Sequence, residues 1–310
     1  MSVVKIEHIN GIDNNEIVVD DDYKMDVPKH LPQGFFSLLS VGNSGSGKTN
    51  ATLNLIQKLK PYYNRYILIS PTGCYDVERG RRPEPKYNKL KIDFDEEHST
   101  YHRGLISEIT CRQRQCLIDF EEWKRYTKVY KMAMEFLKRS KDKSDDAIYS
   151  FPHVEYLMKY DFCEPDDTFY FPTQIVPTAM LIIDDMASTP VYSNGISELV
   201  NLQMKNRHLK MSVLNLVQAY KLCPRSIRLN STVMMLFPCK SEKMIKEFAE
   251  SCSNHYTPEQ FIKLFEYATG NGKPYDFLYI DCREPKGFRK NFNERIDISD
   301  NLVSDNDMNL

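Results

Sequence analysis

Five short apolar runs along the chain predict buried β-strands. Each holds four to seven residues without a charged side chain, which is typical of strands covered on both faces of a parallel sheet. The runs are 35–41, 66–70, 180–183, 212–217 and 232–237. Apolar residues at helical spacing follow several of them, as at 53–59, 196–205 and 242–249. This alternation predicts an α/β fold, a parallel sheet flanked by helices.

The last part of the chain predicts a further helix and a hairpin. Thr257, Pro258 and Gln260 form a helix start, with a threonine cap, proline at the first helical position and glutamine at the third. Residues 275–282 and 287–296 then alternate around a short polar turn. We therefore expect a C-terminal hairpin.

The interval 73–179 is too long for a simple connection inside a sheet, where links usually run about 2–6 residues or a single helix. It therefore predicts a partly helical insertion. A long helix is expected over 111–139, because an apolar stripe recurs there at spacings of three, four and seven. The stripe consists of Cys116, Phe120, Trp123, Tyr130, Ala133 and Leu137. We expect it to pack on the core of the domain, or alternatively to face a neighbouring subunit.

Composition and charge divide the chain into a domain and two tails. Its 310 residues are 41% hydrophobic, enough for one large core. Residues 1–26 carry two lysines and seven acids, and residues 294–310 carry one arginine and five acids. The net charge of −2 therefore leaves about +7 on residues 27–293. We predict an acidic tail at 1–26, one domain at 27–297 and a second acidic tail at 298–310.

Several function classes are excluded or left open at this level. The sequence holds no stretch of about 18 apolar residues and no signal peptide, so we expect no membrane-spanning segment. Eight scattered cysteines without a C-x-x-C pair favour free thiols in a reducing compartment. A basic cluster fits either contacts with nucleic-acid phosphates or a solvated loop. Its members are Arg79, Arg81, Arg82, Lys86, Lys89 and Lys91.

Residues 42–49 match the phosphate-loop pattern G-x-x-x-x-G-K-[ST], between an expected strand and an expected helix. In such a turn, backbone N–H groups surround phosphates, Lys48 reaches the β- and γ-phosphates, and the Thr49 hydroxyl ligates Mg²⁺. The pattern predicts binding of ATP with Mg²⁺. The expected nucleotide contacts are Gly42, Asn43, Ser44, Gly45, Ser46, Gly47, Lys48, Thr49 and Asn50.

Two acids and an amide complete the predicted catalytic group. Asp184 and Asp185 follow the apolar run at 180–183, where the first acid would hold Mg²⁺ and the second would deprotonate the attacking water. This favours a hydrolase over a kinase. Gln218 ends the run at 212–217 and fits a γ-phosphate sensor if that strand lies between the other two.

A short stretch of the chain also holds four possible zinc ligands. His98 and His102 are four residues apart, and Cys111 and Cys116 follow them. The spacing of the two cysteines is too wide for a zinc knuckle. The pattern therefore favours buried thiols and surface histidines.

The ordered set of segments resembles the DNA-packaging ATPases of large DNA viruses and virophages, the poxvirus-type branch of the FtsK/HerA superfamily. The segments are 42–49, 70–72, 181–186, 206–208 and 227–230. The resemblance implies a RecA-like fold with an additional strand in its parallel sheet, placed between the phosphate-loop strand and the strand of the two acids. It also implies ATP hydrolysis at the interfaces of a homo-oligomeric ring, expected to be a hexamer, and translocation of double-stranded DNA into a preformed capsid. Two departures are Asp185, where cellular relatives usually carry Glu, and the insertion at 73–179.

Ring ATPases of this kind take an arginine from the adjacent subunit. Arg228 and Arg207 are the candidates, with Arg225 behind them, and the family pattern favours Arg228. Capsid or vertex proteins would be further partners, with a location in the host-cell cytoplasm, a viral factory or the virion. The alternatives are a cellular DNA pump, a nucleoside or nucleotide kinase, and a non-catalytic, nucleotide-gated capsid assembly factor.

Overall fold

The computed structural model describes residues 25–70, 87, 89–95, 101–140, 145–168, 176–186, 189–192, 198–239, 241–252, 256–270, 275–283 and 287–296. Almost all of the two predicted acidic tails lies outside these residues, so the domain boundaries stay a prediction. Four members of the predicted basic cluster also lie outside the described residues, namely Arg79, Arg81, Arg82 and Lys86. The same holds for His98, one of the possible zinc ligands.

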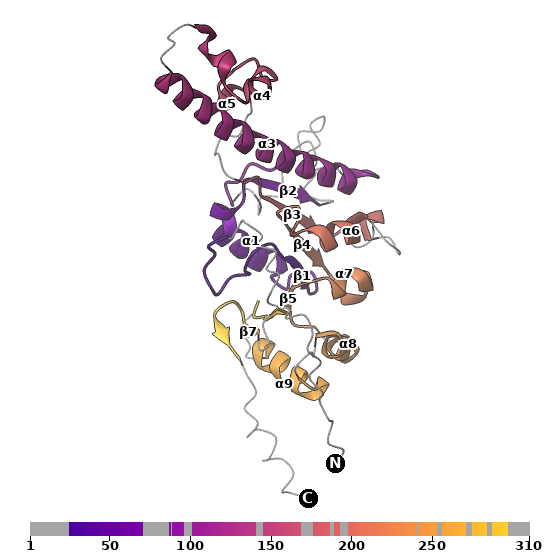
Figure 1. The fold of residues 1–310 in the computed structure, drawn as a ribbon. Coiled ribbons are helices and arrows are strands. Elements are labelled where there is room, and N and C mark those ends of the chain that lie inside the picture. The colour runs from indigo at the N-terminus through magenta and orange to yellow at the C-terminus, as the bar shows by residue number, and fades with distance from the viewer. Residues whose placement is uncertain are drawn as a thin grey trace, which may run out of the picture.

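One mixed sheet organises the described residues (Figure 1), in the order β2-β3-β4-β1-β5-β6-β7-β8. The first five strands in this order are parallel, which confirms the predicted α/β fold with a parallel core. Strand β4 pairs with β1 on one side and β3 on the other, so it is the added strand that the resemblance implies. The parallel strands are β1 (Ser37–Val41), β2 (Arg65–Ile69), β3 (Ala179–Asp184), β4 (Met211–Val217) and β5 (Val233–Leu236).

The C-terminal strands extend the sheet in the antiparallel direction. Strands β6 (Leu278–Asp281) and β7 (Phe288–Lys290) form the predicted hairpin. The alternating segment 287–296 is divided between two strands, because residues 291–293 turn and Asn291 has a φ of 55°. The chain then returns as β8 (Glu294–Arg295) beside β7.

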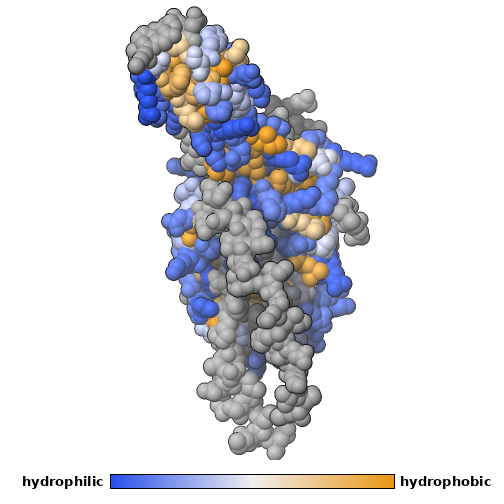
Figure 2. All heavy atoms as spheres, viewed as in Figure 1, coloured by the Kyte–Doolittle hydropathy of each residue, from blue (hydrophilic) through white to orange (hydrophobic). Residues whose placement is uncertain are grey.

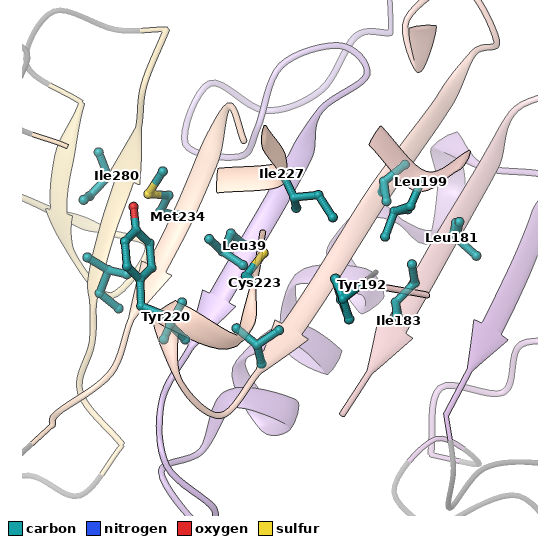
Figure 3. Close-up of a cluster of buried hydrophobic side chains, with 14 of the residues drawn as sticks. Leu39, Leu181, Ile183, Tyr192, Leu199, Tyr220, Cys223, Ile227, Met234 and Ile280 are labelled. Atoms are coloured by element: carbon teal, nitrogen blue, oxygen red, sulfur yellow. The ribbon is translucent and has the colours of Figure 1, made fainter. Parts of the chain in front are cut away.

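The two faces of the sheet carry different cores. Helix α1 (Lys48–Leu59) packs Leu55, Ile56 and Leu59 on one face, where Leu38, Met180 and Leu214 are the strand residues that meet them. Alternate strand residues turn to the other face, because successive side chains of a strand point in opposite directions. Figure 3 shows this second core, in which Leu39, Leu181 and Ile183 meet side chains such as Leu199 and Ile227.

Short helices build the second face. They are α6 (Glu198–Lys205), α7 (Arg225–Leu229), α8 (Glu242–Cys252) and α9 (Pro258–Thr269). The 3-10 turns η4 (Pro190–Tyr192) and η5 (Tyr220–Leu222) add side chains to the same core, whereas η1 (Lys60–Tyr62) follows α1 on the first face. The start predicted for α9 is confirmed as a capping box. Thr257 Oγ1 accepts from the Gln260 backbone N–H at 3.3 Å, and Gln260 Oε1 accepts from the Thr257 N–H at 2.9 Å.

The long helix of the insertion is α3 (Leu105–Arg139), which begins six residues before the predicted start. Its first turns carry Leu105, Ile106 and Ile109 into the core of the sheet. Gly104, at a φ of 94°, directly precedes it.

The far half of α3 forms a helical lobe with residues 145–168, which include η3 (Asp145–Ser150), α4 (Val154–Met158) and α5 (Pro165–Thr168). The prediction that the apolar stripe packs on the main core is wrong for this half, because Tyr130 and Ala133 belong to a separate cluster inside the lobe. Figures 1 and 2 show the lobe projecting from one end of the sheet, with apolar side chains on its surface. Tyr149 of η3 is 57% exposed.

Two further findings bear on the class of protein. Among the described helices, no stretch is both long and apolar enough to cross a membrane. Six described cysteines are free thiols, of which Cys223 is buried, and burial raises the pKa of its thiol to about 12. A thiol with so high a pKa stays protonated and unreactive near neutral pH.

Candidate nucleotide-binding site

The phosphate loop joins the end of β1 to the start of α1, as predicted. Gly47, at a φ of 93°, precedes the first helical residue and lies against the ring of Tyr275. A Cβ on Gly47 would lie 2.8 Å from that ring, and a Cβ on Gly42 would lie 2.6 Å from the Cβ of Phe237. Both positions therefore need glycine. Gly47 needs it because of its positive φ and its contact with Tyr275, and Gly42 because of its contact with Phe237 alone.

The loop presents groups that fit a phosphate chain. Lys48 is buried, and its Nζ donates to the backbone oxygens of Gly42 at 2.6 Å and Asn43 at 3.2 Å. The hydroxyl of Ser46 is buried without a hydrogen-bond partner among the described residues. A cavity of about 250 Å³ lies over the loop and is lined by Gly45, Ser46, Gly47, Lys48, Thr49, Asn50 and Tyr275. An ammonium, an unpaired hydroxyl and a helix N-terminus around one cavity suit an anion of this kind.

The two acids leave β3 in different environments. Asp184 is the last residue of the strand and is 4% exposed, whereas Asp185 is exposed. Asp185 has a φ of 60°, which ends the strand, and its N–H donates to the backbone oxygen of Leu216 in β4 at 3.1 Å. The carboxylate of Asp185 is thereby placed outside the buried face on which Asp184 lies.

Gln218 directly follows β4 and reaches the second acid. Its Nε2 donates to Asp185 Oδ2 at 2.8 Å. The loop is tied to the same strand, because the Gly42 N–H donates to the Val217 oxygen at 3.2 Å. The structure thus brings the phosphate loop, Asp185 and Gln218 to one edge of the sheet, as the sequence predicted, while their catalytic roles stay predictions.

Two tyrosines at this edge were missed by the sequence analysis. The hydroxyl of Tyr87, a buried residue of the insertion, donates to Asp184 Oδ2 at 2.5 Å. Tyr275, which precedes β6, lines the cavity over the loop. Tyr87 belongs to no periodic pattern or motif, and Tyr275 is only the first residue of an alternating run, so no signal in the sequence indicates that either residue lies at the site.

The predicted trans-acting arginines lie in different surroundings. Arg207 is exposed in the turn before β4, and it lines a separate cavity of about 650 Å³ at the amino ends of the strands. The guanidinium of Arg228 lies 4.4 Å from the ring centroid of Tyr220, and its Nε is buried without a hydrogen-bond partner among the described residues. Arg225 is exposed at the first position of α7.

The possible zinc ligands are not brought together in the part that the structure describes. There, no group of three histidine, cysteine, aspartate or glutamate side chains gathers to hold a metal ion, and His98 lies outside that part. Cys111 is exposed and Cys116 half-buried on α3.

No protein-family model matches the sequence, and no curated protein matches it either. Solved structures show a likeness of fold. The genome packaging NTPase B204 from Sulfolobus turreted icosahedral virus 2, in complex with AMPPCP, is 13% identical, with 80% of this chain and 93% of that chain covered and a TM-score of 0.43.

Two further ATPase structures show a similar likeness over part of their length. The cytoplasmic domain of the type VII secretion ATPase EccC from Thermomonospora curvata is 15% identical, with 80% of this chain and 24% of that chain covered and a TM-score of 0.38. EssC (ATPases 2 and 3) from Geobacillus thermodenitrificans is 9% identical, with 84% of this chain and 41% of that chain covered and a TM-score of 0.42. At these values the likeness concerns the fold alone.

The Tyr87–Asp184 hydrogen bond predicts a measurable loss of stability. Tyr87→Phe should lower the free energy of unfolding by about 1.5–3 kcal/mol, because a hydrogen bond to a carboxylate is stronger than one between neutral groups. Urea unfolding measures the loss. The matched control is Tyr63→Phe, which removes a buried bond of 2.6 Å to the neutral Ser212 hydroxyl and should cost about 0.5–1.5 kcal/mol. A smaller loss for Tyr87→Phe than for Tyr63→Phe would contradict this assignment.

Proposed function

We propose that this chain is an ATPase that moves double-stranded DNA and packages a viral genome into a preformed capsid. The observation that carries the ATPase part is the hydrogen bond from Gln218 to Asp185 beside the phosphate loop. This hydrogen bond joins the amide of Gln218, directly after β4, to the carboxylate of Asp185, directly after the neighbouring strand β3. That arrangement suits a water molecule as the attacking group better than a second organic substrate.

Each residue of the site has a task in hydrolysis. Lys48 would leave the loop oxygens that it now contacts and neutralise the β- and γ-phosphates. Thr49 and Asp184 would hold Mg²⁺, which neutralises developing charge on the phosphates when bound. Asp185 would accept the proton of the attacking water, and Gln218 would keep its carboxylate oriented. The hydroxyl of Tyr87 already orients Asp184 through one oxygen.

The DNA-packaging part of the proposal rests on the ordered motifs and their family resemblance. In the order of these segments the chain resembles the poxvirus-type branch of the FtsK/HerA superfamily. By that resemblance the chain would act as a ring of identical subunits, six in number, with a capsid or vertex protein as its anchor. It would work in the host-cell cytoplasm, a viral factory or the virion.

A substitution of Asp185 separates the binding of ATP from its hydrolysis. Asp185→Asn should bind ATP with Mg²⁺ normally and lower turnover by about 10²–10⁴-fold, because the amide keeps the shape of the carboxylate and loses the base. Calorimetry measures the binding, and phosphate release measures the turnover. The matched control is Asp161→Asn in the lobe, another exposed aspartate with positive φ (52°), which should change neither. Wild-type turnover of Asp185→Asn would assign the base to another residue.

The second prediction identifies the arginine that acts across the ring interface. Arg207→Ala and Arg228→Ala should each bind ATP normally as an isolated subunit. The one that acts in trans should lose about 10³–10⁵-fold in turnover. Mixing it with Asp185→Asn subunits should restore part of the activity, since some interfaces then combine an intact arginine with an intact acid.

Arg225→Ala is a third test variant, because Arg225 is exposed on the same short helix as Arg228. The control is Arg139→Ala, at an exposed arginine that ends α3, and it should keep wild-type turnover. Rings of mixed composition must be verified by mass. If neither arginine variant regains activity in such rings, the trans assignment of both residues is wrong.

The third prediction concerns the substrate. ATP turnover should rise with linear duplex DNA of any sequence, and the stimulation should fall steeply with salt, because phosphate contacts release counterions. Turnover titrated with DNA at several salt concentrations measures this. Stimulation by nucleosides instead of DNA would indicate a kinase. Turnover indifferent to DNA at low salt in an assembled ring would contradict translocation.

A further inference from the structure

A tyrosine on the far side of the phosphate loop is exposed although its ring contacts the loop. Tyr275 is 58% exposed, yet its ring atoms lie 2.8–3.1 Å from the position that a Cβ on Gly47 would occupy. It also lines the cavity formed by Gly45 to Asn50. The ring is therefore at the rim of the loop rather than in a core.

The backbone of Tyr275 adopts a conformation that tyrosine rarely takes. Its φ is 79°, in the left-handed region that favours glycine or asparagine. Such strain persists where the surroundings impose it, and it is concentrated at functional sites. The strain makes Tyr275 a candidate for function, and the next residues show what imposes it.

The residues after Tyr275 are anchored to the C-terminal hairpin. Asp276 is buried, lies 3.1 Å from Lys290 Nζ and accepts from Asn291 Nδ2 at 3.0 Å. The Phe277 N–H donates to Asn291 Oδ1 at 3.1 Å, and its ring packs on Phe237, 4.9 Å between centroids. These contacts hold the ring of Tyr275 beside the loop.

The order of the strands places Tyr275 opposite the acids. Strand β1, which leads into the loop, has β4 and then β3 on one side, and β5 and then β6 on the other (Figure 1). Asp185 and Gln218 follow β3 and β4, whereas Tyr275 precedes β6. The phosphate loop therefore lies between the hydrolytic group and the tyrosine.

This arrangement orients a bound nucleotide. The γ-phosphate must face the acids, so the nucleoside leaves the loop on the opposite side. We propose that Tyr275 binds the nucleoside, with its ring stacked on the base of ATP. Every base has a π-face, so the contact adds affinity without selecting strongly among bases. The inference rests on the proposed nucleotide site and names its nucleoside-binding residue.

Isothermal titration of the full chain with Mg²⁺ and three ligands tests this assignment. The ligands are ATP, ADP and inorganic tripolyphosphate, which has the phosphates without the base. Tyr275→Asn should weaken ATP and ADP by the same factor, about 5- to 150-fold for loss of one stacked base, and leave tripolyphosphate unchanged. Asparagine is chosen because it tolerates positive φ. Tyr275→Phe keeps the ring and should retain most of the affinity.

Two control variants make the outcomes distinct. Tyr149→Asn, at a tyrosine of nearly equal exposure in the lobe, should change no affinity. Lys48→Ala should weaken all three ligands, because the ammonium contacts phosphates.

The stacking assignment would be overturned if Tyr275→Asn lowered the affinity for all three ligands equally, or for none of them. Either result would leave the phosphate site intact. A wild-type chain that binds none of the three would instead overturn the proposed function.

Discussion

The site depends on the parallel register of three strands. In β1, β4 and β3 the pairs Val41–Val217 and Leu216–Asp184 lie side by side, so all three strands end at one edge. Main-chain hydrogen bonds then tie both the loop and the second acid to β4. A slip of β4 by one residue would turn its side chains to the opposite faces, and all seven are buried. A strand with no catalytic side chain of its own thus fixes the geometry of the site.

The sequence predicted those parts of the site that are contiguous in the chain. Residues 42–49 and the pair Asp184–Asp185 each directly follow an apolar run that predicts a strand, so the local sequence was enough to place them at strand ends. The position of β4 between β1 and β3 required the family resemblance, because apolar runs do not specify their neighbours. Tyr87 could not be found at all, since it lies 97 residues before Asp184 and joins it only through the fold.

The insertion shows why a periodic stripe does not identify its partner. The 35 residues of α3 span about 50 Å, whereas strands of four to seven residues span about 13–23 Å. A helix more than twice as long as the sheet is deep must find a second core for its remainder. The lobe supplies it, with Tyr126 completely buried and its hydroxyl bonded to the Cys163 oxygen at 2.7 Å. Apolar spacing is the same in both halves, so the sequence alone could not divide them.

Positive φ values occur on both sides of the phosphate loop, and they differ in what they require. Asp185 at 60° is a residue type that visits this region readily, and the turn it makes is what directs its carboxylate to Gln218. Tyr275 at 79° belongs to a type that does not, so the fold must compensate a cost of about 1–3 kcal/mol. The buried Asp276–Lys290 pair and the Asn291 contacts provide that compensation in the hairpin. The antiparallel strands therefore do more than extend the sheet, because they hold an aromatic ring at the edge where the parallel strands end.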